Sequence, residues 1–308
     1  MTLTVSELPQ ATDSGIPAAV AAPATSNPSK GKLVLRGIDK NFNGSNVPAL
    51  RGVSLTCEPG EFVVVVGPSG CGKSTLLNIA AGMLKPDAGD VALDGVPVDG
   101  PGPERAMVFQ DHGLFAWLTA EQNVDFGLKM LGVSKSERRD RVAAALAAVH
   151  LTNSAKKLVH ELSGGMKQRV AIARSLVVNP KVLLMDEPFA ALDAQTRTLL
   201  HAQLQELWLK THKSIVFVTH SVGEAVRLAD RIVVLHAHPG RIRREIRVSL
   251  PHPRDFDSRD ISELAHVVRR EIEDEVNRVN AIGGQPDVWK PQAPGHLGAP
   301  ADDVGSGI

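Results

Sequence analysis

The sequence has few cysteines, no tyrosine and no excess of charge of either sign. Its 308 residues include only two cysteines, Cys57 and Cys71, and 34 basic residues against 34 acidic ones. Two thiols are too few for a cysteine metal cage or a secreted disulfide framework, so we expect a reducing compartment. Balanced charge argues against nucleic acid as the main partner, because phosphate backbones are usually bound by a strongly basic face.

Long hydrophobic runs are also missing. The longest apolar runs, such as Phe62–Val66 and 215–218, have the length of strands, and none approaches the ~20 residues that cross a bilayer. The first 30 residues contain no early Lys or Arg and no continuous apolar stretch, so we expect no signal peptide there. Any role at a membrane is therefore expected to come through a partner.

Composition divides the chain into four parts. Residues 1–31 are rich in Ala, Pro, Ser and Thr, and residues 283–308 are rich in Gly, Pro and Asp, so both are predicted to be disordered. Residues 32–254 are predicted to form one α/β domain, for which a hydrophobic share of 43% is ample. Residues 255–282 have apolar residues at helical spacing and are predicted to form an amphipathic helix.

Within 32–254, short apolar runs alternate with helical patterns, which is typical of a parallel α/β sheet. Strands are predicted at 33–38, 53–56, Phe62–Val66, 91–93, 106–109, 182–185, 215–219 and 232–235, with an edge strand possible at 241–248. Helices are predicted at 73–81, 120–131, 136–149, 165–177, 194–210 and 222–229. Residues 111–177 have almost no strand signal, so they are predicted to be a helical insertion.

The string GPSGCGKST fits the phosphate-binding pattern G-x-x-x-x-G-K-[ST], and it stands between a buried strand and a helical stretch as that loop requires. Glycines let the backbone curl until its N–H groups converge on phosphate oxygens, and the following helix N-terminus adds partial positive charge. Lys73 is expected to reach the β- and γ-phosphates, and Ser74 to ligate Mg²⁺. The predicted nucleotide loop comprises Gly67, Pro68, Ser69, Gly70, Cys71, Gly72, Lys73, Ser74 and Thr75.

A second apolar strand ends in adjacent carboxylates, in the string VLLMDEP at 182–188. Asp186 is expected to hold Mg²⁺ directly or through water, and Glu187 to act as the general base that polarises the attacking water. Two neighbouring acids after a strand can also form an ordinary solvated turn. The phosphate loop earlier in the chain favours the catalytic interpretation.

The string LSGGMKQR at 162–169 resembles the LSGGQ signature of the ABC (ATP-binding cassette) ATPase family, with Met166 in place of the Gln. The resemblance covers about 33–254. It implies that Ser163, Gly164 and Gly165 lie at a helix N-terminus and bind the γ-phosphate of ATP held by the opposite subunit of a dimer. Taken alone, the string would also suit a helix cap with a flexible entry.

Other positions match the same family. Gln110, after the strand AMVF, matches the glutamine that senses Mg²⁺ and the attacking water, and Asp193 matches the loop that crosses the dimer seam. His220 matches the switch histidine that contacts γ-phosphate. Phe42 occupies the place of the aromatic ring that stacks on adenine; a plain core Phe is the alternative.

The family resemblance implies the fold as well. It is a P-loop NTPase ABC cassette of the α/β class: a RecA-like core, an antiparallel β subdomain and an inserted helical subdomain at about 111–177. ATP and Mg²⁺ are the implied cofactors. Cys71 is interpreted as a small residue at a tolerant loop position, although a bulky adduct on its thiol is expected to block ATP.

At finer grain the chain resembles the nitrate/sulfonate/taurine importer branch of the family. The resemblance is carried by GPGPERAMVFQ, LFAWLTAEQNV, DEPFAALDAQTR and HPGRI, with departures from the usual form at Ala116 and Ala190. It implies a homodimeric ATPase at the cytoplasmic face of the plasma membrane, which drives a separate permease and depends indirectly on a solute-binding protein. Trp117 and Leu118 are expected to help form the pocket for the permease, or else to be ordinary core.

Two questions stay open at this stage. The C-terminal helix could dock on its own domain, mediate dimerisation or regulate, with docking as the default. The alternative function is a non-transport ABC ATPase with a regulatory or DNA-associated role, and nitrate, alkanesulfonates, taurine and bicarbonate are all compatible as solutes.

Overall fold

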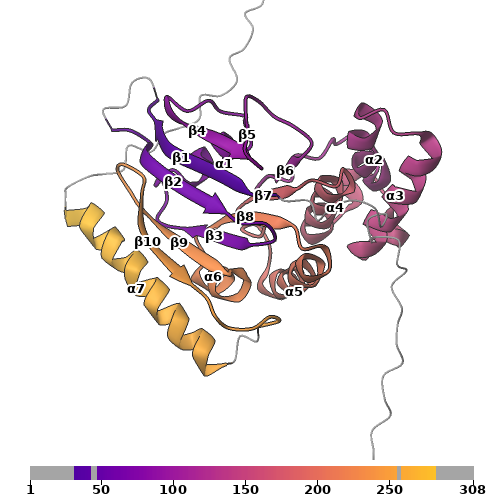
Figure 1. The fold of residues 1–308 in the computed structure, drawn as a ribbon. Coiled ribbons are helices and arrows are strands. Elements are labelled where there is room, and N and C mark those ends of the chain that lie inside the picture. Colours follow the sequence, from indigo (N-terminus) through magenta and orange to yellow (C-terminus); the bar gives the residue numbers. More distant parts are fainter. Residues whose placement is uncertain (1–30, 43–46, 255–257, 282–308) are drawn as a thin grey trace, which may run out of the picture.

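The structure is a computed structural model, and it describes residues 31–42, 47–254 and 258–281. The segments predicted to be disordered, 1–31 apart from Gly31 and 283–308, lie outside the described residues. Figure 1 shows the described part as two sheets flanked by helices, with a helical block on one side.

A six-stranded sheet forms the centre of the molecule, in the order β10-β9-β3-β8-β7-β6. Five of its strands are parallel, and β10 runs antiparallel to β9. Every residue of the two adjacent strands β3 and β8 is buried, as expected of strands covered on both faces. The strands are β3 (Phe62–Val66), β6 (Arg105–Val108), β7 (Val182–Asp186), β8 (Ser214–Thr219), β9 (Arg231–His236) and β10 (Arg241–Arg247).

A second sheet is antiparallel and has the order β2-β1-β4-β5. Its strands are β1 (Leu33–Lys40), β2 (Leu50–Cys57), β4 (Ala88–Leu93) and β5 (Val96–Pro97). Strand β5 is not predicted from the sequence, because a two-residue strand that contains proline has no run of strand-forming residues. Helix α1 (Lys73–Ala80) shares one buried apolar cluster with residues of both sheets.

Residues 111–177 form the predicted helical insertion. They contain α2 (Ala120–Met130), α3 (Lys135–Ala148), α4 (Gly164–Val177) and two short 3-10 helices, η2 (Thr152–Ser154) and η3 (Val159–Glu161). Thr119 caps α2 in a reciprocal capping box with Gln122, which fixes where that helix begins. In Figure 1 the block of α2, α3 and α4 projects to one side of the central sheet.

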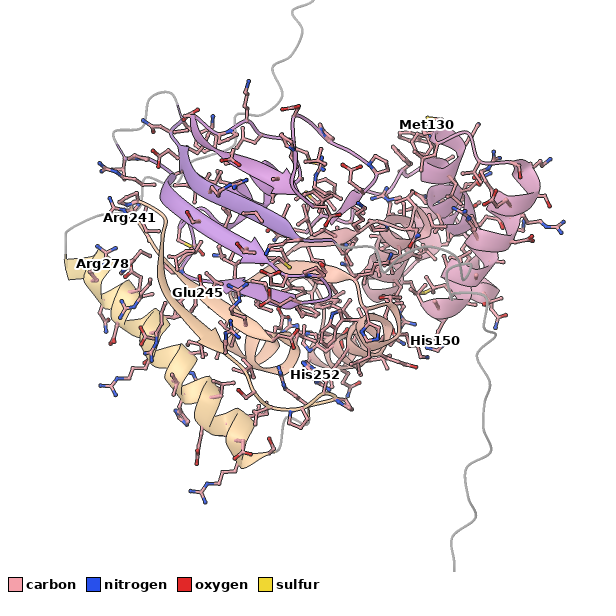
Figure 2. The ribbon with its side chains drawn as sticks, in the orientation of Figure 1. Met130, His150, Arg241, Glu245, His252 and Arg278 are labelled. Atoms are coloured by element: carbon pink, nitrogen blue, oxygen red, sulfur yellow. The ribbon has the colours of Figure 1, made fainter. Side chains whose placement is uncertain are left out.

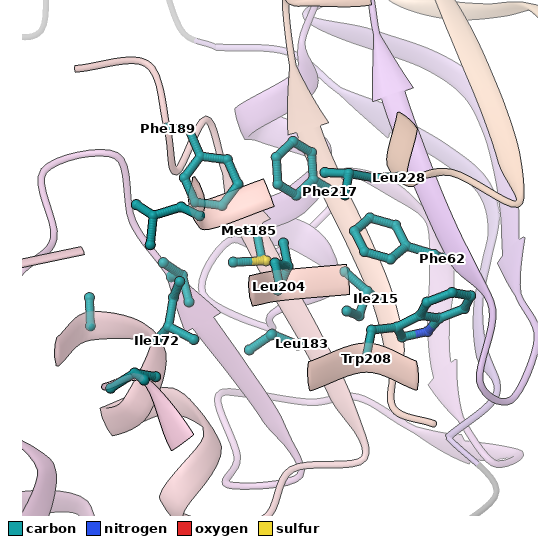
Figure 3. Close-up of a cluster of buried hydrophobic side chains, with 14 of the residues drawn as sticks. Phe62, Ile172, Leu183, Met185, Phe189, Leu204, Trp208, Ile215, Phe217 and Leu228 are labelled. Atoms are coloured by element: carbon teal, nitrogen blue, oxygen red, sulfur yellow. The ribbon is translucent and has the colours of Figure 1, made fainter. Parts of the chain in front are cut away.

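The two faces of the central sheet bury two separate apolar cores. Along β3, Phe62, Val64 and Val66 pack into one core, and the alternate residues Val63 and Val65 pack into the other. This follows from the two-residue period of a strand. Figure 3 shows the first core, in which Phe62 lies beside Trp208 and Phe217, with ring centroids 5.6 Å and 6.0 Å away.

Three further helices cover the first core: α5 (Ala194–Thr211), α6 (Val222–Leu228) and α7 (Arg259–Ala281). Helix α7 lies inside the segment 255–282 that was predicted to be helical. It packs on α6 and β9, with Ile261 and Val268 buried, and Figure 1 shows it running along this flank of the sheet. No helix within the described residues combines the length and hydrophobicity that a membrane crossing requires.

Candidate functional site

The predicted site residues gather at the carboxyl ends of the parallel strands. The register pairs Val66 at the end of β3 with Thr219 at the end of β8, and pairs Asp186 at the end of β7 with Val218. The residues that follow these strand ends therefore emerge at one edge of the sheet. Open α/β sheets bind ligands at this edge.

The loop after β3 curls in the way a phosphate cradle requires. Gly70 and Gly72 have φ angles of 77° and 91°, a left-handed conformation that favours glycine. A Cβ on Gly72 would lie 2.7 Å from the Ala49 carbonyl oxygen, so no side chain fits there. Helix α1 begins directly after Gly72, which leaves its first N–H groups facing the loop.

Lys73 is 6% exposed, and its ammonium group lies over the loop. Its Nζ donates hydrogen bonds to the carbonyl oxygens of Gly67 and Pro68, both at 2.9 Å. Cys71 is fully buried beside it, with Sγ 3.8 Å from Nζ. Burial raises the pKa of the Cys71 thiol, although the nearby Lys73 opposes this. The thiol is therefore protonated at neutral pH and unreactive while it stays buried.

Ser74 and Asp186 form a pair of oxygen donors. The Ser74 hydroxyl donates to Asp186 Oδ1 at 3.0 Å, across the gap between α1 and β7. Burial raises the pKa of Asp186, the Ser74 hydrogen bond lowers it and the neighbouring Glu187 raises it again. A hydroxyl and a carboxylate are ligands that Mg²⁺ accepts, so this pair fits a magnesium ion carried in with nucleotide.

Glu187 directly follows β7 and His220 directly follows β8, and their side chains contact each other. His220 Nδ1 lies 2.9 Å from Glu187 Oε2. Glu187 has a φ of 42°, unusual for a residue with a side chain, and its N–H donates to the Val218 carbonyl oxygen at 2.9 Å. This strained backbone sets the direction of the carboxylate, as strain often does at functional sites.

A buried polar network that the sequence does not predict lies next to His220 in the chain. Glu224 is 4% exposed; it accepts a 2.5 Å hydrogen bond from the Thr219 hydroxyl, and Glu224 Oε1 lies 3.2 Å from His201 Nε2. Thr219 Oγ1 in turn accepts from the Ser221 N–H at 3.0 Å. The pattern Ser221-x-x-Glu224 at the start of α6 is the available signal, but it suggests only a helix cap.

The signature segment begins a helix, as predicted. Ser163 is the N-cap of α4, and its hydroxyl accepts from the Met166 N–H at 3.4 Å. Ser163 and Gly164 are exposed, whereas Gly165 is buried, and a Cβ on it would lie 2.5 Å from Thr196 Cγ2. Only the first two residues of the three are therefore open to an incoming anion.

The three remaining predicted residues, Asp193, Gln110 and Phe42, are exposed or partly exposed. Asp193 is exposed and caps α5 by accepting from the Thr196 N–H at 2.9 Å, which lowers the pKa of its carboxyl. Gln110 is exposed, two residues beyond the end of β6. Phe42 is partly exposed, with Lys40 Nζ 5.9 Å from its ring centroid.

A groove opens where the helical block meets the end of β6. It has a volume of about 350 Å³, and its lining includes Phe109, Phe115, Phe126 and Arg174. Trp117 does not line it; that side chain is 74% exposed and touches the groove through Phe115, with ring centroids 5.5 Å apart. Trp117 therefore belongs neither to the lining of this groove nor to the buried core of the helical block.

Comparisons with known proteins agree with this geometry. A family model described as ABC transporter matches residues 50–190. A nitrate import ATP-binding protein, NrtD of Synechocystis sp., is 52% identical over 221 residues, which are 71% of this chain and 83% of that protein. A taurine import ATP-binding protein, TauB of Chromobacterium violaceum, is 49% identical over 210 residues, 68% of this chain and 80% of that protein.

Solved structures also resemble the chain. A dimeric ATP-binding cassette in a post-hydrolysis state, bound to ADP and Pi, is 34% identical with a TM-score of 0.64 over 71% of this chain and 100% of its own. CbiO1 of Clostridium perfringens, part of an ABC transporter complex, is 28% identical with a TM-score of 0.66 over 82% of this chain and 99% of its own. The expected cassette fold is confirmed, and the chain belongs to the ABC transporter family as one of its nucleotide-binding ATPases.

Proposed function

We propose that this chain energises the import of a small anion of the nitrate, sulfonate or taurine type through a separate permease. The observation that carries the proposal is the convergence of Lys73, Ser74, Asp186, Glu187 and His220 at one sheet edge. The solute class is supported by the nitrate and taurine import proteins that resemble the chain.

Nucleotide is held first by the phosphate loop. Backbone N–H groups around Gly70 and Gly72 surround the phosphates, and Lys73 turns from its loop carbonyls toward the β- and γ-phosphates. The Ser74 hydroxyl and the Asp186 carboxylate would hold Mg²⁺, together with Gln110, two residues beyond β6. Bound Mg²⁺ neutralises charge that develops on the phosphate oxygens. Phe42 offers its ring face to adenine.

Hydrolysis then requires one base. Glu187 accepts a proton from the water that attacks the γ-phosphorus in line, the bond to the bridging oxygen breaks, and the products are ADP and phosphate. In the absence of nucleotide, His220 Nδ1 contacts the Glu187 carboxylate. Substrate phosphate replaces that contact as a partner of His220, so the histidine responds to whether a γ-phosphate is present.

The site is completed by a second copy of the chain. Ser163 and Gly164 are exposed at the N-terminus of α4, where an N–H pair and the helix dipole favour an anion, and Asp193 lies near the seam. The dimeric ATP-binding cassettes that resemble this chain support the same arrangement. A homodimer with two composite sites therefore closes on ATP and opens after hydrolysis.

The permease docks in the groove lined by Phe115, Phe126 and Arg174, with Trp117 at its margin. An apolar groove with one guanidinium suits an amphipathic helix from the partner. This contact places the ATPase at the cytoplasmic face of the membrane. A solute-binding protein on the other side of the membrane contributes only through the permease.

The proposal is tested by purifying the tagged full chain from membranes of its own cells and reconstituting the captured complex in liposomes. We expect a multi-helix permease to copurify, and MgATP to drive uptake of nitrate, taurine or an alkanesulfonate. The same complex with Lys73→Ala should capture the permease but transport nothing. ATPase activity that DNA stimulates, with no membrane protein captured, would contradict the proposal.

A further inference from the structure

The back of the phosphate loop rests on the turn that joins β9 to β10. A Cβ on Gly240 would lie 2.4 Å from the Cys71 carbonyl oxygen, and a Cβ on Gly67 would lie 3.1 Å from the Leu235 carbonyl oxygen. The Gly240 N–H also donates to Ala49 O at 3.1 Å. Backbone atoms at the start and middle of the loop therefore sit directly on residues 235–240.

Ala49 and Leu50 connect the same turn to the helix start. The Gly240 carbonyl oxygen accepts from the Arg51 N–H at 2.9 Å, and Leu50 pairs with Gly240 in an isolated parallel bridge. A Cβ on Gly72 would lie 2.6 Å from Leu50 Cδ2. A displacement of the turn would therefore reach both Cys71 and Gly72, the two residues that precede Lys73.

The turn itself is fixed by one carboxylate of α7. Glu275 is fully buried, although glutamate is seldom buried without partners. Its Oε1 accepts from the Ala237 N–H at 2.8 Å, and its Oε2 lies 2.5 Å from His236 Nδ1 and 3.3 Å from Arg243 Nη1. Both oxygens of the carboxylate thus have partners, which come from β9, the turn and β10.

Arg278 closes the arrangement one helical turn later. It pairs with Glu275, and its Nη2 donates to the Ala237 carbonyl oxygen at 2.6 Å. Ala237 is therefore held at both its N–H and its C=O by α7. Figure 2 shows Arg278 near the C-terminal end of α7. Such charge-assisted hydrogen bonds are among the strongest that a side chain makes.

We infer that Glu275 is a positioning residue for ATP binding: it fixes residues 236–240, and these in turn hold the phosphate loop in its cradle conformation. The inference rests on the proposed role of that loop in nucleotide binding. Burial alone would raise the pKa of Glu275, but hydrogen bonds from Arg278, Ala237 and His236 outweigh it and lower the pKa to about 2. The carboxylate is charged at any physiological pH.

The chain contains a matched control on the same helix. Glu271 lies one turn before Glu275 and binds Arg243 and Arg244 on β10, which lie outside residues 236–240. Glu271→Gln makes the same chemical change and also weakens the docking of α7. It separates a general effect of helix docking from a specific effect on residues 236–240.

The test uses the two cysteines as internal probes in the full-length protein. Cys71 lies in the loop and Cys57 lies on β2, and both are free and fully buried. Glu275→Gln should raise the rate of thiol labelling at Cys71 relative to Cys57 by about fivefold, measured by peptide mass spectrometry. It should raise KM for MgATP by about the same factor and leave kcat within about twofold.

Arg278→Gln should change both readouts in the same direction, which covers the case in which Glu275→Gln folds poorly. Glu271→Gln should leave both close to the parent values. An unchanged labelling ratio in the Glu275 and Arg278 variants, or an equal change in Glu271→Gln, would overturn the inference. The labelling ratio needs no nucleotide, so a parent protein that fails to bind ATP would instead count against the proposed function.

Discussion

At the scale of single residues, the arrangement separates the groups that bind from the group that reacts. Lys73 and Ser74 lie on the loop and the first turn of α1, where backbone N–H groups converge. Glu187 follows the last residue of β7, the magnesium candidate Asp186, and its strained backbone sets the direction of its carboxylate. Binding and hydrolysis should therefore respond separately to substitution.

Glu187→Gln should leave ATP binding intact and lower kcat by about 10²–10⁴-fold, because an amide cannot accept the proton of the attacking water. The variant should also accumulate as an ATP-bound dimer, visible by size-exclusion chromatography. Steady-state hydrolysis and equilibrium binding of MgATP measure the two effects. Glu206→Gln, at an exposed glutamate of α5 that pairs with Lys210, is the control. Normal turnover in Glu187→Gln would remove this residue from the mechanism.

Several of these residues could be predicted from sequence alone. The phosphate loop and the acidic pair are contiguous strings whose strand and helix context is local, so Lys73, Asp186 and Glu187 were readily identified. His201 and Glu224 were not, because their contact joins α5 to α6 and no local pattern reports it. The burial of Gly165 against Thr196 has no local sequence signal either, because it depends on how α5 packs.

At the scale of elements, a polar network connects two helices to the end of a strand. The network of Glu224, His201 and Thr219 connects α5 and α6 to the end of β8, just before His220. His201 also lies edge-on to Phe189, with ring centroids 5.0 Å apart. The end of β8 is therefore linked to the segment that follows Glu187.

Thr219→Val keeps the shape and strand preference of the side chain but removes its hydroxyl. It leaves a buried glutamate oxygen without this donor, so the free energy of unfolding should fall by about 1–3 kcal/mol. Turnover should fall as well, because the Ser221 N–H loses the acceptor that orders the chain around His220. Denaturant titration and ATPase assays measure both. Thr198→Val, at an exposed position of α5, is the matched control; equal losses in the two variants would contradict the role of the network.

The ion pairs of Glu275 predict how stability depends on pH. Its pKa falls from an ordinary 4.5 to about 2 in the folded protein, where His236, Arg243 and Arg278 face the carboxylate. A lowered carboxyl pKa contributes stability that is complete above the unfolded pKa and is lost as pH falls through the folded pKa. The stability difference between the parent and Glu275→Gln should therefore stay constant above about pH 5 and narrow below about pH 4.

Denaturant titrations of both proteins from pH 7 down to pH 3.5 measure this difference. Glu273→Gln, at an exposed glutamate of the same helix, controls for the general titration of surface carboxylates. A difference between parent and Glu275→Gln that does not change with pH would show that the carboxylate is not ion-paired in the folded protein.

At the scale of the whole molecule, each catalytic site is proposed to draw on two chains. Lys73 lies at the edge of the central sheet, and Ser163 caps α4 in the helical block, where its hydroxyl binds its own helix. A symmetric dimer can bring the Ser163 of one copy to the phosphate loop of the other.

Mixing two inactive variants tests this arrangement. Lys73→Ala and Ser163→Arg should each abolish hydrolysis as homodimers. A mixed dimer contains one site with both residues intact, so an equal mixture should recover up to about a quarter of the parent activity, given random pairing of a symmetric dimer. ATPase rates before and after mixing measure the recovery. A mixture no more active than either variant would mean that the two residues do not act in one shared site.

The architecture was predictable to a similar extent as the site. Alternating strand and helix patterns predicted the parallel core, and the missing strand signal predicted the insertion at 111–177. The groove was not predictable, because Phe126 and Arg174 come from separate helices that meet only in the folded block. Sequence periodicity indicates which face of an element is apolar. It does not indicate which apolar side chains stay exposed after the elements pack together.

The alternation along β3 has a thermodynamic consequence for the motor. This strand contributes to both apolar cores and leads directly into the phosphate loop. Neither core can loosen without releasing the strand that carries the cradle. Nucleotide that binds to the loop should therefore stabilise both apolar cores together.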